Sequence, residues 1–279
     1  MQPDGIYIDA TVGGGGHAEA ILRRLESGRL LGIDRDPAAL AVARERLAVF
    51  GEKLTLLHGN FAEIDELHRR TGLAPAQGVL ADLGLSSMQL ADVSRGFSFS
   101  AEGPLDMRMD PSSETTAADL VNQASERELA EMIFRLGEER HSRRIARSIM
   151  KARPIRTSTE LAQVVTRAIP SRAGLHQIHA ATRTFLALRI AVNRELENLE
   201  QFLARVLAVL ASGGRVVMIS FHSLEDRRVK QAFVSWRGEG RARLLTRKVV
   251  RPGADELAAN PRARSAKLRA AEKEAVVSG

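Results

Sequence analysis

Short apolar runs of strand length alternate along this sequence with stretches long enough to form amphipathic helices. Five such runs occur: GIYIDATV (residues 5–12), RLLGID (29–34), LTLLHG (54–59), GVLADLG (78–84) and GRVVMISF (214–221). Strands separated by helix-length segments are typical of a parallel sheet that helices cover on both faces. The alternation therefore predicts an α/β fold built on a doubly wound, mostly parallel sheet.

A long interruption separates the fourth run from the fifth. About 130 residues lie between Asp82 and Gly213, whereas the first four runs follow one another at intervals of roughly 20 to 30 residues. The interruption shows helical periodicity and no strand signal of comparable strength. We predict a helical insert domain over residues 111–179, within a discontinuous domain formed by residues 1–110 and 180–279.

The segment after the insert, residues 184–210, has the periodicity of one long amphipathic helix that leads back to the sheet. Gly213 and Gly214 follow it, and glycines often end helices because they adopt the left-handed backbone conformation without strain. We therefore expect the helix to end at these glycines. The tail from Trp236 onward is rich in Arg and interspersed with Gly and Pro.

Four consecutive glycines, Gly13–Gly16, follow the first run and precede a helical stretch. Glycines at this point let a ligand approach the backbone at the carboxyl edge of the sheet. Gly13, Gly15 and Ala18 also satisfy the dinucleotide-binding pattern G-x-G-x-x-G/A. That pattern is loose, and a tight strand-to-helix turn without a ligand is the structural alternative.

Polar or aromatic side chains end the next three runs at the same predicted edge. Asp34 ends the second run, about twenty residues after the glycines, where an acid accepts hydrogen bonds from both hydroxyls of a ribose. Asn60 and Phe61 follow the third run, where they could bind and stack an adenine, and Asp82 ends the fourth. Asp36, followed by a proline, better fits a helix N-cap. Packing for Phe61 and capping for Asp82 are the structural alternatives.

An adenosine-containing ligand at this edge is either a nicotinamide dinucleotide or S-adenosylmethionine. Asp9, just before the glycines, distinguishes the two. A carboxylate near a pyrophosphate is repelled, whereas a carboxylate near the ammonium group of a methionyl moiety is attracted. Asp9 therefore favours S-adenosylmethionine.

The composition limits the partners and the compartment. Forty-one Lys and Arg against 34 Asp and Glu give a net charge of +7 and make a polyanionic partner worth considering. There is no Cys, which excludes disulfides, thiolate metal sites and thiol catalysis and fits a reducing cytoplasm. No apolar run approaches the roughly 20 residues of a membrane-spanning helix, and no signal peptide is visible. We expect a cytoplasmic protein without a membrane partner.

Several long strings of this sequence are more specific than any glycine pattern. They are IYIDATVGGGGHAEAIL (6–22), LLGIDRDPAAL (30–40), LADLGLSSMQLADVSRGFSFSAEGPLDMRMD (80–110), GEERHSRRIARSI (137–149), ATRTFLALRIAVNRELENLE (181–200), GGRVVMISFHSLEDRRVK (213–230) and NPRARSAKLRAAEK (260–273). Together they resemble the family of bacterial S-adenosylmethionine-dependent methyltransferases that modify the exocyclic N4 amine of one cytosine in the decoding centre of 16S ribosomal RNA.

The resemblance implies a Rossmann-like methyltransferase domain interrupted by a helical domain that recognises the substrate. It also implies 16S rRNA in the small ribosomal subunit as the partner and leaves the oligomeric state open. The residues that it assigns to the cofactor are Gly15, Gly16, His17, Asp34, Phe61, Asp82 and Gln89. His17 and Gln89 enter only through the resemblance; otherwise a hydrogen bond at a helix start and a solvated loop would explain them.

Two features depart from the family pattern. Members usually begin some twenty residues earlier, with a His-x-Pro-Val segment before the first strand. Ala180 also stands where a proline is usual. The first departure bears on the cofactor pocket and the second on local geometry rather than on chemistry.

The candidates for catalysis lie at the same edge of the sheet. A cytosine amine is a poor nucleophile, so an enzyme must orient it and accept its hydrogen bonds. Asp82 offers a carboxylate for this task or lies against the cofactor, and Ser86 and Ser87 are the next substrate contacts by sequence. His222 is a further candidate on the substrate side; a capping network with Ser223 as N-cap and Asp226 in its first turn is equally compatible. We expect no metal, because methyl transfer from a sulfonium needs no Lewis acid.

Arginines recur at helical spacing inside the predicted insert. Arg140, Arg143, Arg144 and Arg147 fall at i, i+3, i+4 and i+7, which predicts one cationic helix face suited to an RNA backbone. A solvated face is the alternative. The Arg-rich tail invites the same interpretation.

Two other function classes compete with an RNA (cytosine-N4)-methyltransferase. One is a nucleotide-dependent oxidoreductase, which the glycine pattern permits. The other is a non-catalytic, basic RNA-binding factor for ribosome assembly, which the charge permits. Binding of S-adenosylmethionine excludes the first alternative, and methyl incorporation into RNA excludes the second.

Overall fold

The computed structural model describes residues 1–169 and 181–275 and divides into two compact units. The first unit comprises Met1–Gly84 and Leu196–Gly279, and the second comprises Leu85–Glu195. Within the described ranges, no helix is both long and apolar enough to cross a membrane. Ala180, where the family pattern has a proline, lies outside the described residues.

A seven-stranded sheet forms the centre of the first unit, in the order β3-β2-β1-β4-β5-β7-β6. Its strands are β1 (Ile6–Asp9), β2 (Arg29–Asp34), β3 (Leu54–His58), β4 (Ala76–Asp82), β5 (Leu210–Ser220), β6 (Ala242–Leu244) and β7 (Lys267–Lys273). The first five strands pair in parallel, and β7 runs antiparallel to both β5 and β6. The predicted mostly parallel α/β sheet is therefore confirmed.

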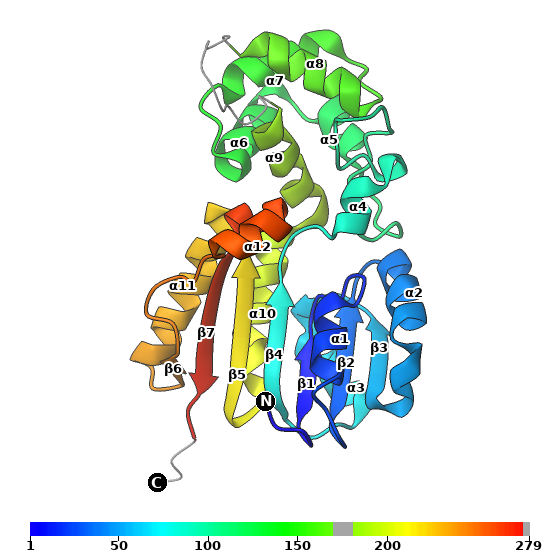
Figure 1. The fold of residues 1–279 in the computed structure, drawn as a ribbon. Coiled ribbons are helices and arrows are strands. Elements are labelled where there is room, and N and C mark those ends of the chain that lie inside the picture. Colours follow the sequence, from blue (N-terminus) through cyan, green and yellow to red (C-terminus); the bar gives the residue numbers. More distant parts are fainter. Residues whose placement is uncertain (170–180, 276–279) are drawn as a thin grey trace. The chain divides into compact units, whose positions relative to one another are not determined.

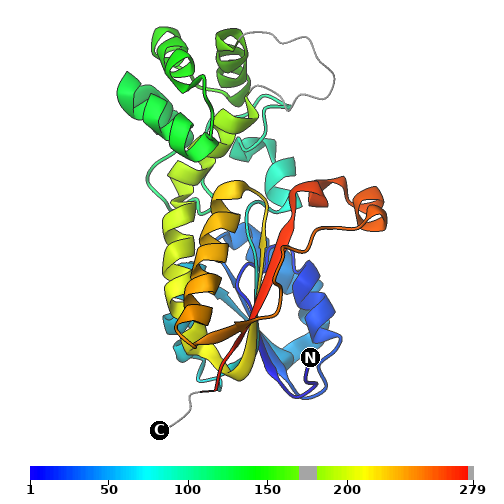
Figure 2. The ribbon, with the colours of Figure 1, turned by 90° about the vertical axis from the view of Figure 1, so that its left-hand side faces the viewer.

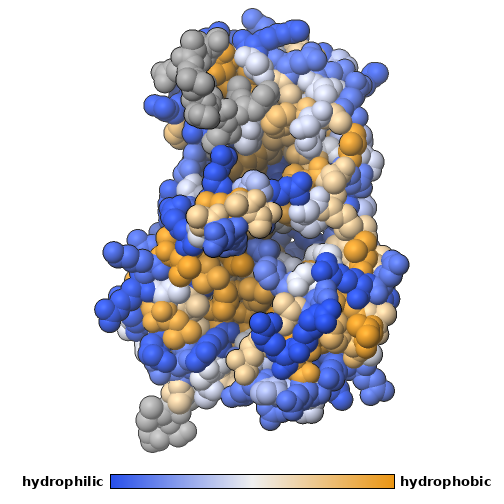
Figure 3. All heavy atoms as spheres, viewed as in Figure 1, coloured by the Kyte–Doolittle hydropathy of each residue, from blue (hydrophilic) through white to orange (hydrophobic). Residues whose placement is uncertain are grey.

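Helices cover both faces of this sheet (Figures 1 and 2). On one face, α1 (Gly16–Leu22) and α2 (Pro37–Arg46) pack against residues such as Leu30. On the other face, α3 (Ile64–Thr71), α10 (Glu195–Val209) and α11 (Ser223–Gly238) enclose the largest apolar core, with Phe202 fully buried. Because strand side chains alternate between faces, Val216 and Met218 enter this core while Val217 stays half-buried on the opposite face. Apolar surface is visible over β5 and β7 there (Figure 3).

The second unit is helical, as the periodicity predicts. Its helices are α4 (Ser87–Ala91), α5 (Ala117–Gln123), α6 (Glu126–Gly137), α7 (Ser142–Ala152), α8 (Ser158–Ala168) and α9 (Thr182–Asn193). The unit extends beyond the expected 111–179 on both sides. Leu105 and Met107 before that range, and Phe185 and Leu188 after it, pack into the same apolar core as α6 and α7. Side-chain packing, rather than the absence of strand signals, sets its limits.

The long helix expected over residues 184–210 is wrong, because the chain forms two helices there. Arg194 adopts a left-handed conformation with φ of 49° and separates α9 from α10. Next to it, the buried Asn193 side chain donates to the carbonyls of Met107 and Arg189 and accepts from the Met109 N–H, at 2.7–2.9 Å. These tertiary hydrogen bonds favour a break that the apolar periodicity does not encode.

The expected helix end at Gly213 and Gly214 is also wrong. Helix α10 ends at Val209, and both glycines belong to β5. Gly213 has a φ of 73°, and the pairing of β4 with β5 shifts register between Ala76 and Gly78, so the left-handed glycine accompanies an irregularity of the sheet.

Candidate functional site

The carboxyl ends of three parallel strands bring three aspartates to one edge of the sheet. Asp9 ends β1, Asp34 ends β2 and Asp82 ends β4. These strands are neighbours in the sheet, with β1 between β2 and β4. Open α/β folds bind their ligands at this edge, so the arrangement matches the edge inferred from the sequence.

The glycine run fixes Asp34. The N–H of Gly13 donates to Asp34 Oδ2 at 2.8 Å, and the N–H of Asp36 donates to Oδ1 at 2.9 Å. Gly15 has a φ of 83°, and a Cβ there would meet Leu47 at 3.1 Å, so the turn itself requires this glycine. At Gly16, by contrast, a Cβ would meet no atom within 4 Å. The backbone is therefore open to a ligand at the start of α1.

Burial raises the pKa of the Asp34 carboxyl, and the two backbone donors oppose this effect. Both oxygens have a lone pair left after these bonds, so the carboxylate can still accept from a ligand. Asp36 caps α2 by accepting from the Ala38 N–H at 3.0 Å, which confirms its expected role as an N-cap.

Asp9 is the most deeply buried of the three aspartates, with no exposed surface. One oxygen accepts from the Thr11 N–H at 3.2 Å, and Oδ2 has no hydrogen-bond partner among the described residues. Burial raises the pKa of Asp9 to about 7. A buried oxygen without a partner is costly, which marks this position as one that a ligand would complete.

Asp82 is held from two sides. Its N–H donates to the Thr11 hydroxyl at 2.7 Å, which ties β4 to the segment after β1. Its Oδ2 lies 3.4 Å from His17 Nε2 on α1, and its buried Oδ1 has no partner among the described residues. The hydrogen bond with Asp82 raises the pKa of His17.

Thr11 was not among the residues that the sequence singled out. The signal in the sequence that could have identified Thr11 is its position two residues after the end of a strand. Only the folded sheet brings it to Asp82, about seventy residues away in the chain.

Asn60 and Phe61, which follow β3 and Gly59, have structural contacts. Asn60 caps the following 3₁₀ turn by accepting from the Ala62 N–H at 3.0 Å. The ring of Phe61 packs edge-on against Phe202, with ring centroids 5.1 Å apart, and remains partly exposed. Packing does not use the whole ring, so one part remains available to a ligand.

Ser86, Ser87 and Gln89 form the start of α4 in the second unit. Ser86 is the N-cap: its hydroxyl accepts from the Gln89 N–H at 3.2 Å, and Gln89 Oε1 accepts from the Ser86 N–H at 3.0 Å. Gln89 is buried, so the solvated loop considered as its alternative is wrong. Ser87 is the first helical residue and is exposed. Capping engages Ser86 and leaves the Ser87 hydroxyl to solvent.

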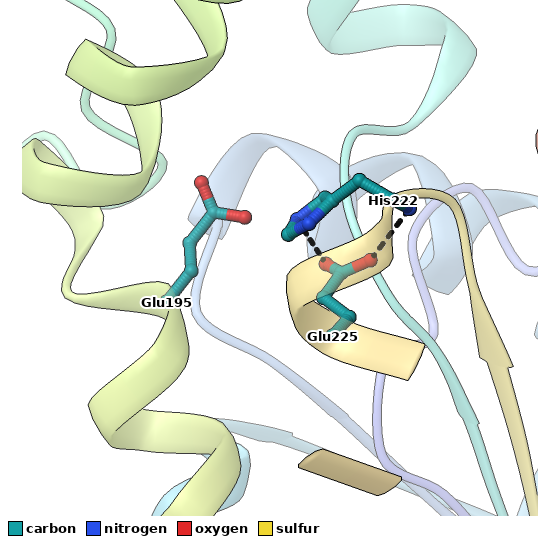
Figure 4. Close-up of side chains that lie close together, drawn as sticks. All are labelled: Glu195, His222 and Glu225. Atoms are coloured by element: carbon teal, nitrogen blue, oxygen red, sulfur yellow. Dashed lines mark hydrogen bonds and ion pairs between the residues drawn. The ribbon is translucent and has the colours of Figure 1, made fainter. Parts of the chain in front are cut away.

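His222, and not Ser223, is the N-cap of α11. Glu225 Oε2 accepts from the N–H groups of Phe221 and His222, at 3.0 and 3.4 Å. Its other oxygen lies 3.1 Å from His222 Nε2, and Figure 4 shows the imidazole facing this carboxylate. The capping network of the sequence analysis therefore exists with different members. Asp226 instead pairs with Arg269 of β7 at 2.7 Å.

The four arginines of the predicted cationic face do not share one helix. Arg140 precedes α7, whereas Arg143, Arg144 and Arg147 lie on it, and all four are exposed. Arg147 lies 3.5 Å from Glu126 of α6. For Arg143 and Arg144, the described residues provide no ion-pair partner. The cationic surface is thus centred on these two residues.

The donors and acceptors at the sheet edge fit S-adenosylmethionine. Asp9 and Asp82 each present a buried oxygen that no described residue pairs with, which suits a ligand that donates hydrogen bonds and carries positive charge. Asp34 retains acceptor capacity for hydroxyl groups, and the backbone at Gly16 is open. A pyrophosphate would face three carboxylates here, which disfavours a dinucleotide.

Comparisons with known proteins extend over nearly the whole chain. The model of the MraW methylase family matches residues 1–274. Ribosomal RNA small subunit methyltransferase H of Syntrophobacter fumaroxidans is 51% identical over 291 residues, which cover 98% of this chain and 91% of the relative. The protein of the same name from Gloeobacter violaceus is 54% identical over 274 residues, covering 98% and 83%. The protein of the same name from Synechococcus elongatus is 49% identical over 275 residues, which cover 98% of this chain and 90% of the relative.

A family model that spans both units, together with relatives of about 50% identity at this coverage, determines the assignment. The chain belongs to the MraW methylase family.

Proposed function

We propose that this protein transfers a methyl group from S-adenosylmethionine to the exocyclic N4 amine of a cytosine in the decoding region of 16S rRNA. Membership of a methylase family confirms the expected enzyme class and its S-adenosylmethionine cofactor. The relatives are named as methyltransferases of small-subunit ribosomal RNA, which supports the RNA substrate. The unpaired, buried oxygen of Asp82 at the cofactor edge is the observation that favours an amine as the methyl acceptor.

The residues at the sheet edge divide the work of binding the cofactor. Asp34, fixed by Gly13 and Asp36, accepts from the ribose hydroxyls. Asp9 faces the ammonium group, because an ionised carboxylate attracts it and Oδ2 has no partner in the described part of the chain. The exposed part of Phe61 contacts the adenine. The start of α1, with Gly15, Gly16 and His17, lies against the ligand. We also assign Gln89 to the cofactor.

When bound, S-adenosylmethionine supplies an electrophilic methyl group on a sulfonium. The amine of cytosine needs help because its lone pair is delocalised into the ring. Asp82 accepts a hydrogen bond from this amine and stabilises the positive charge that develops on nitrogen. His17 and Thr11 hold Asp82 in place. The His17 imidazole approaches the Asp82 carboxylate, and the Thr11 hydroxyl accepts a hydrogen bond from the Asp82 N–H.

Ser87 and His222 are proposed as further contacts to the substrate. The Ser87 hydroxyl is exposed at the start of α4 and is not needed for the cap. His222 presents an imidazole whose orientation the Glu225 carboxylate restricts. Ser86 is a weaker candidate for a substrate contact, because its hydroxyl already accepts a hydrogen bond from the Gln89 N–H.

A transfer assay with nucleoside analysis tests the proposal. Purified protein is incubated with methyl-labelled S-adenosylmethionine and unmodified small-subunit RNA, with large-subunit RNA as the control. We expect the label in N4-methylcytidine from small-subunit RNA alone. Label in another nucleoside would overturn the assigned atom. If the protein binds RNA but transfers no methyl group, either to free RNA or to the assembled subunit, the assembly-factor alternative would be favoured.

A further inference from the structure

A cavity of about 220 Å³ lies in the first unit between α11 and the β6–β7 end of the sheet. The order of the strands places β5 between this end and β4, which is the nearest of the strands that carry the three aspartates. Helix α11 runs beside β6 and β7 (Figures 1 and 2). The cavity is therefore separate from the site formed by Asp9, Asp34 and Asp82.

Cations dominate the polar lining of the cavity. Lys230 and Arg237 enter it from α11, and Arg247 enters it from the segment after β6. Within residues 1–169 and 181–275, none of these three has an ion-pair partner. Arg269 also lines the cavity, but its guanidinium binds Asp226 through two hydrogen bonds of 2.7 and 3.2 Å. The described residues that line the cavity include no carboxylate, so they leave three positive charges uncompensated.

Apolar side chains form the rest of the lining. Phe233 is buried at the base, with its ring stacked on Trp236 at 5.0 Å between centroids. Val234 is 44% exposed, although it stands one turn after Lys230 on a charged helix face. Leu244 of β6 is half-buried opposite. The cavity thus joins an apolar base to a cationic rim, which suits a ligand with a flat, weakly polar part and an anionic part.

Unpaired positive charge continues along the chain beyond the cavity. Lys248 and Arg251 are exposed and, in the part of the chain that the structure describes, have no ion-pair partner. Earlier in the same tail, Arg241 pairs with Glu239 at 3.2 Å and Arg243 pairs with Glu272 at 2.7 Å. Ion pairing therefore neutralises the first part of the basic tail and leaves the part next to the cavity free to contact an extended polyanion.

We propose that this cavity binds one nucleotide of a single-stranded RNA segment, at a distance from the target cytosine. Lys230, Arg237 and Arg247 contact its phosphates, and its base packs on Val234 and Leu244. Lys248 and Arg251 contact the RNA backbone as it continues. The inference rests on the proposed function, in which RNA is the substrate. Binding through phosphates and an apolar base contact tolerates many sequences, so the site anchors the RNA rather than selecting the cytosine.

The salt dependence of RNA binding tests this site in the full chain. In the triple variant Lys230→Gln, Arg237→Gln, Arg247→Gln, three phosphate contacts are lost. For single-stranded RNA, each contact contributes about 0.7 to the slope of log affinity against log salt. We expect the slope for a single-stranded RNA oligonucleotide to fall by about 2. The KM for small-subunit RNA should rise at least tenfold, with kcat and S-adenosylmethionine affinity unchanged.

The matched control removes the same charge from the opposite end of the sheet. Arg44, Arg69 and Arg70 are exposed on α2 and α3, beside β2 and β3, and changing them to Gln should leave the slope unaltered. Val234→Asn tests the apolar contact, and we expect about threefold weaker binding with an unchanged slope. Equal slopes for the triple variant, the control and the parent protein would overturn the proposal. The proposal would also be overturned if the triple variant lost its binding to an acidic peptide but kept its binding to RNA. The oligonucleotide experiment needs no methyl transfer, so it tests the site even if the proposed function fails.

Discussion

At the scale of single residues, three aspartates at one sheet edge differ in how the fold holds them. Two backbone N–H groups fix Asp34, whereas Thr11 and His17 hold Asp82. Asp9 is fully buried, and one of its oxygens has no partner among residues 1–169 and 181–275. In the proposed function each carboxylate has a separate task, and each task has a separate test.

The ribose contact is tested by Asp34→Ala. Hydrogen bonds to a charged acceptor contribute about 1.5 to 3 kcal/mol each, so the loss of two should weaken S-adenosylmethionine binding at least tenfold. RNA binding should remain intact. Calorimetric titration of the folded variant measures both affinities, and an unchanged affinity for S-adenosylmethionine would remove Asp34 from the site.

The raised pKa of Asp9 predicts a pH dependence of cofactor binding. Below its pKa of about 7 the carboxyl is neutral, and above it the carboxylate attracts the ammonium group. The affinity for S-adenosylmethionine should therefore increase as the pH rises towards 7. In Asp9→Asn the affinity should be lower at pH 7 and lose this dependence. A parent protein with pH-independent affinity would contradict the assignment.

Asp9 also links stability to pH in the protein without cofactor. The folded state keeps the proton up to about pH 7, whereas the unfolded carboxyl loses it near 3.8. The folded state binds more protons in this interval, so the contribution of Asp9 to the free energy of unfolding falls as the pH rises through it. Denaturant titrations of the parent and Asp9→Asn should differ in this slope.

Asp82→Asn tests the acceptor for the target amine. The variant keeps the size of the side chain and one acceptor but removes the charge. We expect single-turnover methyl transfer to slow by about 10², which is typical for one electrostatic contact to a transition state. Rapid-quench measurements at saturating cofactor and RNA separate this effect from binding. Transfer at the parent rate would confine Asp82 to a structural or cofactor-binding role.

At the scale of elements, tertiary contacts decide where helices begin and end. Asn193 binds three backbone groups and accompanies the break between α9 and α10, although the apolar periodicity continues through it. At α11, the Glu225 carboxylate reaches the Phe221 N–H, which moves the cap from the expected Ser223 to His222. Capping at Asp36 was predictable because its partner is two residues away.

The prediction at the scale of elements concerns helix α7. Arg143 and Arg144 are exposed, and in the described ranges neither has an ion-pair partner, so we expect them to contact RNA phosphates. The double variant Arg143→Glu, Arg144→Glu should flatten the salt dependence of RNA binding and spare cofactor binding. The same reversal at Arg23 and Arg135 is the control, because these arginines already pair with Glu19 and Glu131. If the slope does not change, α7 is merely a solvated face.

At the scale of the whole molecule, the sequence predicts most of the parallel sheet. Buried parallel strands are continuous apolar runs, and their carboxyl ends share one edge, so Asp34 and Asp82 could be placed at that edge from the sequence. Strands β6 and β7 were not predicted. The first has three residues, and the second, KLRAAEK, lacks an apolar run because it lies near the sheet edge.

Contacts between distant segments explain which features of the structure the sequence does not predict. Thr11 reaches Asp82, and Arg269 reaches Asp226, only because the sheet brings them together. The limits of the helical unit depend in the same way on Leu105 and Phe185 packing into its core. None of these pairings leaves a periodic signal in the sequence.

Mass-spectrometric mapping of methyl groups on ribosomal RNA detects the product of the proposed reaction. RNA is compared from cells without this protein, from cells with it and from cells carrying Asp34→Ala. We expect one cytosine in the decoding region of small-subunit RNA to carry an N4-methyl group only when the parent protein is present. A methyl pattern that does not change with the protein, or a change at another atom or in large-subunit RNA, would contradict it.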